Sequence, residues 1–187
     1  PVTNITTDLS DTDTGDWISS GYVFGMDFDY SNGLIYLGLF QGMFGVYDPV
    51  TNITTDLSDT DTGDWIGTDN HIFSFARDPS NGLLYMGTYN PMEYGKIGVY
   101  NSSSNVTTDL SDTAADDWIV NGMFSMPSLA FDSSNDLVYL AALTPPDYDG
   151  ALGVYDPSTN VTTDLSGTFE MTGMFVTASD NIYATCF

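Results

Sequence analysis

Residues 1–18 read PVTNITTDLSDTDTGDWI, and the same eighteen letters return without a change at 49–66. Weaker copies follow as NSSSNVTTDLSDTAADDWI at 101–119 and PSTNVTTDLSGTF at 157–169. The equivalent asparagines of the four copies are 48, 53 and 55 residues apart. This period matches that of propeller blades and is too long for leucine-rich or ankyrin repeats. The chain is therefore predicted to be a tandem array of blade-like units.

Each repeat is predicted to hold four short strands, because apolar and aromatic runs alternate with clusters of turn residues. In the third repeat the strands are expected at about 123–131, 137–143, 152–155 and 161–165. The Asn-Gly pairs at 32–33 and 81–82 are expected to supply the positive φ angles of tight hairpin turns. No window has convincing helical periodicity. We therefore predict an all-β fold, a β-propeller of four-stranded antiparallel blades.

The two ends of the chain leave strands over. A single domain, 1–187, is predicted to contain a lone strand at 1–10, repeats at about 17–58, 66–111 and 118–166, and a partial blade at 169–187. These pieces make about four blades with an incomplete terminal blade. Either the end pieces combine within one ring, or a neighbouring molecule completes them, because an unpaired strand edge is a template for strand addition.

The blade core reads GLLYMGT at 82–88 and GVYDPSTNVTTDLS at 153–166. These motifs resemble the repeat of two-component-regulator sensor propellers and, more loosely, kelch and streptogramin-lyase-like propellers. The sensor repeats usually carry a Trp where Tyr36, Tyr85 and Tyr139 stand, and nothing here matches the catalytic His of a streptogramin lyase. The resemblance implies a fold more than a function, because propellers host many unrelated functions.

The charge of the chain is strongly one-sided. Two basic residues stand against 26 acidic ones, for a formal net charge of −24. Such a surface repels phosphate and anionic lipid, so we expect neither nucleic-acid binding nor direct membrane insertion. An acidic halophile protein would have much the same composition. The lone Cys186 excludes an internal disulfide.

Five Asn-x-Ser/Thr sequons point to covalent glycans in an extracellular or cell-surface protein. They are Asn4, Asn52, Asn101, Asn105 and Asn160. The alternative is that each Asn is present as a turn residue, duplicated together with its repeat. Both interpretations remain open from the sequence.

The acidic connector between repeats places carboxylates at alternating positions, which suits a hard cation such as calcium. The candidate ligands are Asp11, Asp13, Asp16, Asp59, Asp61 and Asp64. The alternative is a solvated acidic loop. We favour that alternative because the spacing lacks the distal Glu of an EF-hand.

Two irregular insertions, 89–96 and 144–150, interrupt the repeat and are expected to form a binding face. Its candidate residues are Tyr89, Glu93, Tyr94, Asp147, Tyr148 and Asp149. Trp17, Trp65 and Trp118 share one repeat position, where packing between blades is favoured over sugar stacking. His71 is solitary and has no partner motif for catalysis.

Together these patterns predict a secreted or cell-surface structural repeat protein, glycosylated, that self-associates head-to-tail into a fibre by strand complementation. We predict that it is not an enzyme. The alternative is a ligand-binding or carbohydrate-binding sensor propeller module from a larger extracellular receptor.

Overall fold

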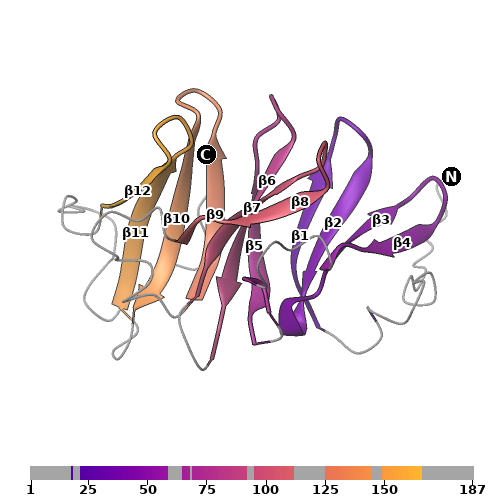
Figure 1. Ribbon diagram of the computed structural model, residues 1–187, viewed down its shortest axis with the longest axis horizontal. Coiled ribbons are helices and arrows are strands. Elements are labelled where there is room, and N and C mark those ends of the chain that lie inside the picture. The colour runs from indigo at the N-terminus through magenta and orange to yellow at the C-terminus, as the bar shows by residue number, and fades with distance from the viewer. Residues whose placement is uncertain are drawn as a thin grey trace, which may run out of the picture.

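The computed structural model describes residues 18, 22–58, 65–67, 69–91, 95–111, 125–144 and 149–165. Within these ranges the chain forms three four-stranded antiparallel blades, which lie side by side in chain order (Figure 1). Blade 1 contains β1 (Val23–Asp29), β2 (Leu34–Leu39), β3 (Phe44–Asp48) and β4 (Ile53–Asp56). Blade 2 contains β5 (His71–Arg77), β6 (Leu83–Tyr89), β7 (Ile97–Asn101) and β8 (Val106–Asp109). Blade 3 contains β9 (Ser125–Asp132), β10 (Leu137–Thr144), β11 (Asp149–Asp156) and β12 (Val161–Asp164).

This architecture confirms the predicted all-β fold of four-stranded antiparallel blades. Each blade lies within one of the predicted repeats, 17–58, 66–111 and 118–166. The lone strand at 1–10 and the partial blade at 169–187 fall outside the described residues, so the completion of a fourth blade stays a prediction.

The first strand of each blade lies against the first strand of the next, so that β1, β5 and β9 follow one another along one edge. Blades 2 and 3 are also joined by a single strand pair, between Tyr89 of β6 and Ser125 of β9. In the part of the chain that the structure describes, the remaining strands pair only within their own blade. The blades are therefore held together mainly by side-chain packing between their faces.

Two strands of blade 3 are longer than the sequence predicted. β11 begins at Asp149 rather than at 152, because β10 continues to Thr144 and the two strands pair as far as Thr144 and Asp149. Part of the insertion 144–150 is thus strand. A short 3-10 turn, η2 (Phe40–Gly42), links β2 to β3 and has Gln41 in the left-handed region at φ 61°.

The hairpin turns differ from the expected tight form. Positive φ occurs at Gly33 (77°) and Gly82 (74°), whereas the preceding asparagines keep negative φ. The turn spans five residues, since the N–H of Gly33 donates to the carbonyl of Asp29 at 2.7 Å. The carboxylate of Asp29 also accepts from the N–H of Ser31 at 2.9 Å, which stabilises the longer turn.

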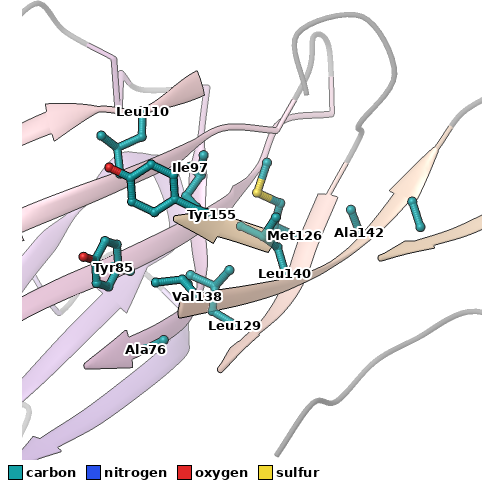
Figure 2. Close-up of a cluster of buried hydrophobic side chains, with 11 residues drawn as sticks. Ala76, Tyr85, Ile97, Leu110, Met126, Leu129, Val138, Leu140, Ala142 and Tyr155 are labelled. Atoms are coloured by element: carbon teal, nitrogen blue, oxygen red, sulfur yellow. The ribbon is translucent and has the colours of Figure 1, made fainter. Parts of the chain in front are cut away.

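The core of the described ranges consists of two clusters, one in each gap between neighbouring blades. In the gap between blades 2 and 3, Tyr85, Ile97 and Leu110 meet Val138 and Leu140 (Figure 2). In the gap between blades 1 and 2, the repeat-equivalent residues are Tyr36, Phe44, Leu57, Leu84 and Met86. Full burial of one such side chain stabilises a fold by roughly 1.5–3 kcal/mol, so these contacts dominate the cohesion of the blades.

Trp65 lies in the cluster between blades 1 and 2 and is 2% exposed. Its ring lies where a Cβ of Gly98 would be, so only glycine fits at that position of β7. Its indole Nε1 is buried and has no hydrogen-bond partner among the residues that the structure describes. Trp65 therefore packs between blades, as the sequence favoured, while Trp17 and Trp118 fall outside the described residues. None of the helices in the described ranges is long and apolar enough to span a membrane.

Candidate functional site

Three of the sequon asparagines occupy the same exposed turn, between the third and fourth strands of each blade. Asn52, Asn105 and Asn160 have φ angles of 58°, 56° and 56°, a left-handed conformation that asparagine tolerates better than most residues. In each turn a tyrosine hydroxyl, five residues earlier in the chain, donates to Oδ1 of the asparagine at 2.9–3.0 Å. These asparagines therefore have a structural role in the turn and also lie at the surface.

The other two sequons differ. Asn101 is the last residue of β7, where its Oδ1 accepts from the N–H of Ser103 at 2.9 Å. Asn101 therefore stabilises the start of the turn, whereas Asn105 is the residue of that turn with left-handed backbone angles. Asn4 lies outside the described residues.

The aspartates that open the β3–β4 and β11–β12 turns are also bound locally. Backbone and side-chain hydrogen bonds from Val50 and Thr51 lower the pKa of Asp48. Hydrogen bonds from Ser158, through its side chain and its N–H, lower the pKa of Asp156. These carboxylates stay ionised, so the asparagine-bearing turns of blades 1 and 3 carry negative charge, whereas the β7–β8 turn of blade 2 begins at the neutral Asn101.

Arg77 holds blades 1 and 2 together near the hairpin turns. Its Nε donates to Asp27 at 2.7 Å and its Nη1 to Asp29 at 3.0 Å, and its guanidinium lies 4.7 Å from the centre of the Tyr36 ring. Burial alone would raise the pKa of Asp29, but hydrogen bonds from Ser31 and the charge of Arg77 hold it below its usual value. An open hollow of about 390 Å³ lies beside this ion pair, lined by turn residues such as Ser80 and Ser102.

His71 packs in an aromatic cluster. Its Nδ1 accepts a hydrogen bond from the N–H of Gln41 at 3.0 Å, and its ring stacks on Phe40 at 4.2 Å between centroids. Burial lowers its pKa, so the neutral ring that this acceptor role requires is favoured. These contacts assign His71 to holding η2 against blade 2.

The aromatic cluster reaches the surface at Tyr22, which is 75% exposed. Phe24 stacks on Phe73 at 4.5 Å, and Phe73 meets the edge of Tyr89 at 5.4 Å. Of the predicted binding face, only Tyr89 is thus placed by its side chain, in contact with His71 and Phe73. Asp149 is the first residue of β11. The other candidates, Glu93, Tyr94, Asp147 and Tyr148, lie outside the described residues.

A second surface was not found by the sequence analysis. The face of blade 1 that points away from blade 2 is apolar and surrounds a shallow hollow of about 260 Å³. Its lining includes Val23, Met26, Ile35, Leu37 and Tyr47. The repeat could have revealed this surface from the sequence, because the residues of blades 2 and 3 at the same repeat positions pack between blades.

The predicted cation ligands cannot be placed, because Asp11, Asp13, Asp16, Asp59, Asp61 and Asp64 all lie outside the described residues. Within the described ranges, no group of three or more His, Cys, Asp or Glu side chains is arranged to hold a metal ion. Calcium binding by the acidic connector stays a prediction.

No protein-family model and no curated protein sequence matches the chain. Among solved structures, it is similar to the GH74 xyloglucanase from Xanthomonas campestris, with a TM-score of 0.57 and 12% identity. The fold is of the β-propeller type. The match covers 76% of this chain and 21% of the xyloglucanase, so the chain spans about a fifth of that enzyme's length. At this identity the likeness concerns the fold alone, and the closer resemblance to two-component-regulator sensor propellers stays a prediction.

Proposed function

We propose that this propeller chain is a secreted or cell-surface structural repeat protein whose blade turns carry N-linked glycans. The observation that supports the proposal is the shared turn of Asn52, Asn105 and Asn160, exposed and left-handed in each blade. The tyrosine hydroxyl binds Oδ1 of each asparagine. Nδ2, the atom that an N-linked glycan would occupy, takes no part in that hydrogen bond.

The remaining chemistry of the described residues suits a structural role. Arg77 is held by Asp27 and Asp29, and His71 is held by Gln41 and Phe40. Both groups serve the packing between elements. A glycan at each turn would cover the turn end of the blades and leave the faces between blades untouched, because the turns and the faces are separate surfaces.

Glycopeptide mass spectrometry on protein from its native source tests the proposal. Digestion should use a protease that cleaves at aspartate or at aromatic residues, because Arg77 and Lys96 are the only sites for trypsin. We expect glycan mass on peptides containing Asn52, Asn105 and Asn160. Asn81 is the matched control, since it is exposed in a hairpin turn and lacks a sequon. Bare asparagines at all three turns would overturn the proposal.

A second candidate function is carbohydrate binding by the aromatic cluster. It is favoured by the exposed ring of Tyr22 beside Phe24, because aromatic faces are common platforms for sugars. The similar solved structure is a xyloglucanase, a protein named for acting on a polysaccharide. Isothermal titration with neutral soluble glucans would detect such binding. Tyr22→Ala should abolish the heat of binding, whereas Val50→Ala, in a distant turn, should leave it unchanged.

A further inference from the structure

The hollow beside the ion pair of Arg77 lies between the turns of blades 1 and 2. Its volume is about 390 Å³, at the lower end of the range for small-molecule sites. Its lining comes from the β1–β2 turn of blade 1 and from the β5–β6 and β7–β8 turns of blade 2. The lining residues are 29–31, 77, 79–82 and 102–103. We call this site the turn hollow.

Several residues that line the turn hollow depart from the repeat. Tyr30 stands where blade 2 has Pro79 and blade 3 has Ser133. Arg77 stands where both other blades have Phe, and Ser102 stands where both have Pro. These departures are far apart in the chain, yet the fold gathers them around one hollow. The blade fold does not require these side chains, because the other blades form without them.

The lining of the turn hollow is electrically neutral, in a chain with a formal net charge of −24. Among the described residues that line it, the charged ones are Asp29 and Arg77, which pair with each other at 3.0 Å. Arg77 is also bound by Asp27 at 2.7 Å, so it has no uncompensated charge to attract an anion. The aspartate that opens the asparagine-bearing turn in the other two blades is replaced by Asn101 in the β7–β8 turn. The hollow therefore favours an uncharged ligand.

The polar groups of the lining suit a ligand that carries hydroxyls. The hydroxyls of Ser31 and Ser80 donate to aspartates of their own turns at 2.6 and 2.7 Å, which leaves their oxygens as acceptors. Oδ1 of Asn81 accepts from the N–H of Leu83 at 2.9 Å, which leaves its amide nitrogen as a donor. A hydroxyl both donates and accepts, so it pairs with either kind of group.

An exposed aromatic ring completes the lining. Tyr30 is 90% exposed, and its ring meets Phe28 in a T-shaped contact at 4.8 Å between centroids. The ring offers an apolar face beside the polar groups of the turns, and a sugar ring has the same combination of C–H faces and hydroxyl edges.

We propose that the turn hollow binds a neutral mono- or disaccharide, with a sugar ring against Tyr30 and its hydroxyls bonded to Ser31, Ser80 and Asn81. The site is separate from the aromatic cluster around Tyr22, because Tyr22 precedes β1 and Tyr30 follows it, at the other end of the strand. The proposal goes beyond the proposed function and does not depend on glycans carried by the chain.

The test uses the full chain from a host that does not glycosylate, so that no glycan of its own enters the hollow. Saturation-transfer NMR at millimolar ligand uses cellobiose, lactose and the methyl glycosides of glucose, galactose, mannose and N-acetylglucosamine as probes. We expect at least one of them to bind. Tyr30→Ser should weaken that binding about tenfold because the ring is lost, whereas Tyr30→Phe should keep it. Ser133→Ala, at the repeat position of Tyr30 in blade 3, is the control and should bind as the wild type does.

Three outcomes would overturn the proposal. Absence of binding by every neutral probe would do so. Binding that is unchanged in Tyr30→Ser would place the sugar elsewhere on the chain, for example at the cluster around Tyr22. Tighter binding of glucosamine, the cationic counterpart of glucose, than of any neutral probe would mean that attraction to the acidic surface governs binding. Circular dichroism checks the fold of each variant, and Tyr30→Phe separates the loss of the ring from a disturbed turn.

Discussion

The hydroxyl of Tyr100 donates a hydrogen bond of 2.9 Å to Oδ1 of Asn105, across the turn between β7 and β8. The same pair recurs in the other blades as Tyr47 with Asn52 and Tyr155 with Asn160. Burial raises the pKa of Tyr100 to about 12, so the hydroxyl remains a donor throughout the neutral range. Tyr100 therefore links the surface turn of blade 2 to the cluster between blades 1 and 2, where its ring packs.

Replacing Tyr100 by Phe should destabilise the protein by about 1 kcal/mol, because the substitution removes the hydrogen bond and keeps the ring in its cluster. Urea unfolding followed by circular dichroism measures the change. Tyr47→Phe is the matched control and should cost less, since the bond to Asn52 is exposed to water. An equal loss of unfolding free energy in Tyr100→Phe and Tyr47→Phe would show that burial does not strengthen the hydrogen bond.

Removing the charge of Arg77 should be far more costly. Arg77→Met leaves Asp27 and Asp29 without their cation, and an uncompensated buried charge costs about 3 kcal/mol. Lys96→Met is the control, since the Lys96–Asp109 contact is 4.0 Å long and about one-third exposed at both ends, and it should change stability by less than about 0.5 kcal/mol. Similar melting temperatures for the two variants would contradict the role of Arg77 in holding blades 1 and 2 together.

The carboxylate of Asp29, which accepts hydrogen bonds from Ser31 and pairs with Arg77, predicts a pH dependence. The pKa of Asp29 is lowered in the folded protein from the usual 3.8, so its stabilising effect is complete above that value and is lost as the pH falls through the folded pKa. Asp29→Asn should therefore be less stable than the wild type at pH 6, and the gap should narrow below about pH 3.8. Unfolding curves from pH 6 to pH 2 measure this difference, and a gap that is constant over the range would argue against it.

Gly98→Ala should destabilise the contact between blades 1 and 2, because the added Cβ would overlap the buried ring of Trp65. Overpacking of this kind costs about 1–3 kcal/mol. Trp65→Phe in the same chain should recover part of the loss, since the smaller ring makes room. A double-mutant cycle measured by thermal unfolding gives the coupling energy, and purely additive effects would mean that the two residues do not interfere.

Calcium binding by the acidic connector is a prediction from the sequence. If the aspartates hold the ion, millimolar calcium should raise the melting temperature, because a ligand that binds only the folded state stabilises it. Magnesium at the same ionic strength is the control for simple charge screening. Asn at all four of Asp11, Asp13, Asp59 and Asp61, in the two identical connectors, should remove the calcium effect and keep the magnesium effect. Identical shifts with both ions would leave the connector as a solvated loop.

The sequence by itself determined the repeat, the all-β class and the places of the turns. These features are local: alternating apolar residues favour strands, and Asn-Gly or Asp-Pro pairs favour turns, whatever lies elsewhere in the chain. The prediction of a tight turn with positive φ at both Asn32 and Gly33 was wrong, and its cause is also local. Gly33 alone adopts a positive φ, and the carboxylate of Asp29 supports a longer turn.

Only the tertiary structure decided how these units act on one another. Arg77 meets Asp27 across 50 residues of sequence, and the N–H of Gln41 reaches His71 across 30. The apolar face of blade 1 became visible for the same reason. Val23 and Ile72 have similar side chains at the same repeat position, and among the described residues a neighbouring blade covers Ile72 but not Val23. Burial depends on which surfaces meet in space, and a repeated sequence is the same whether or not its next neighbour is present.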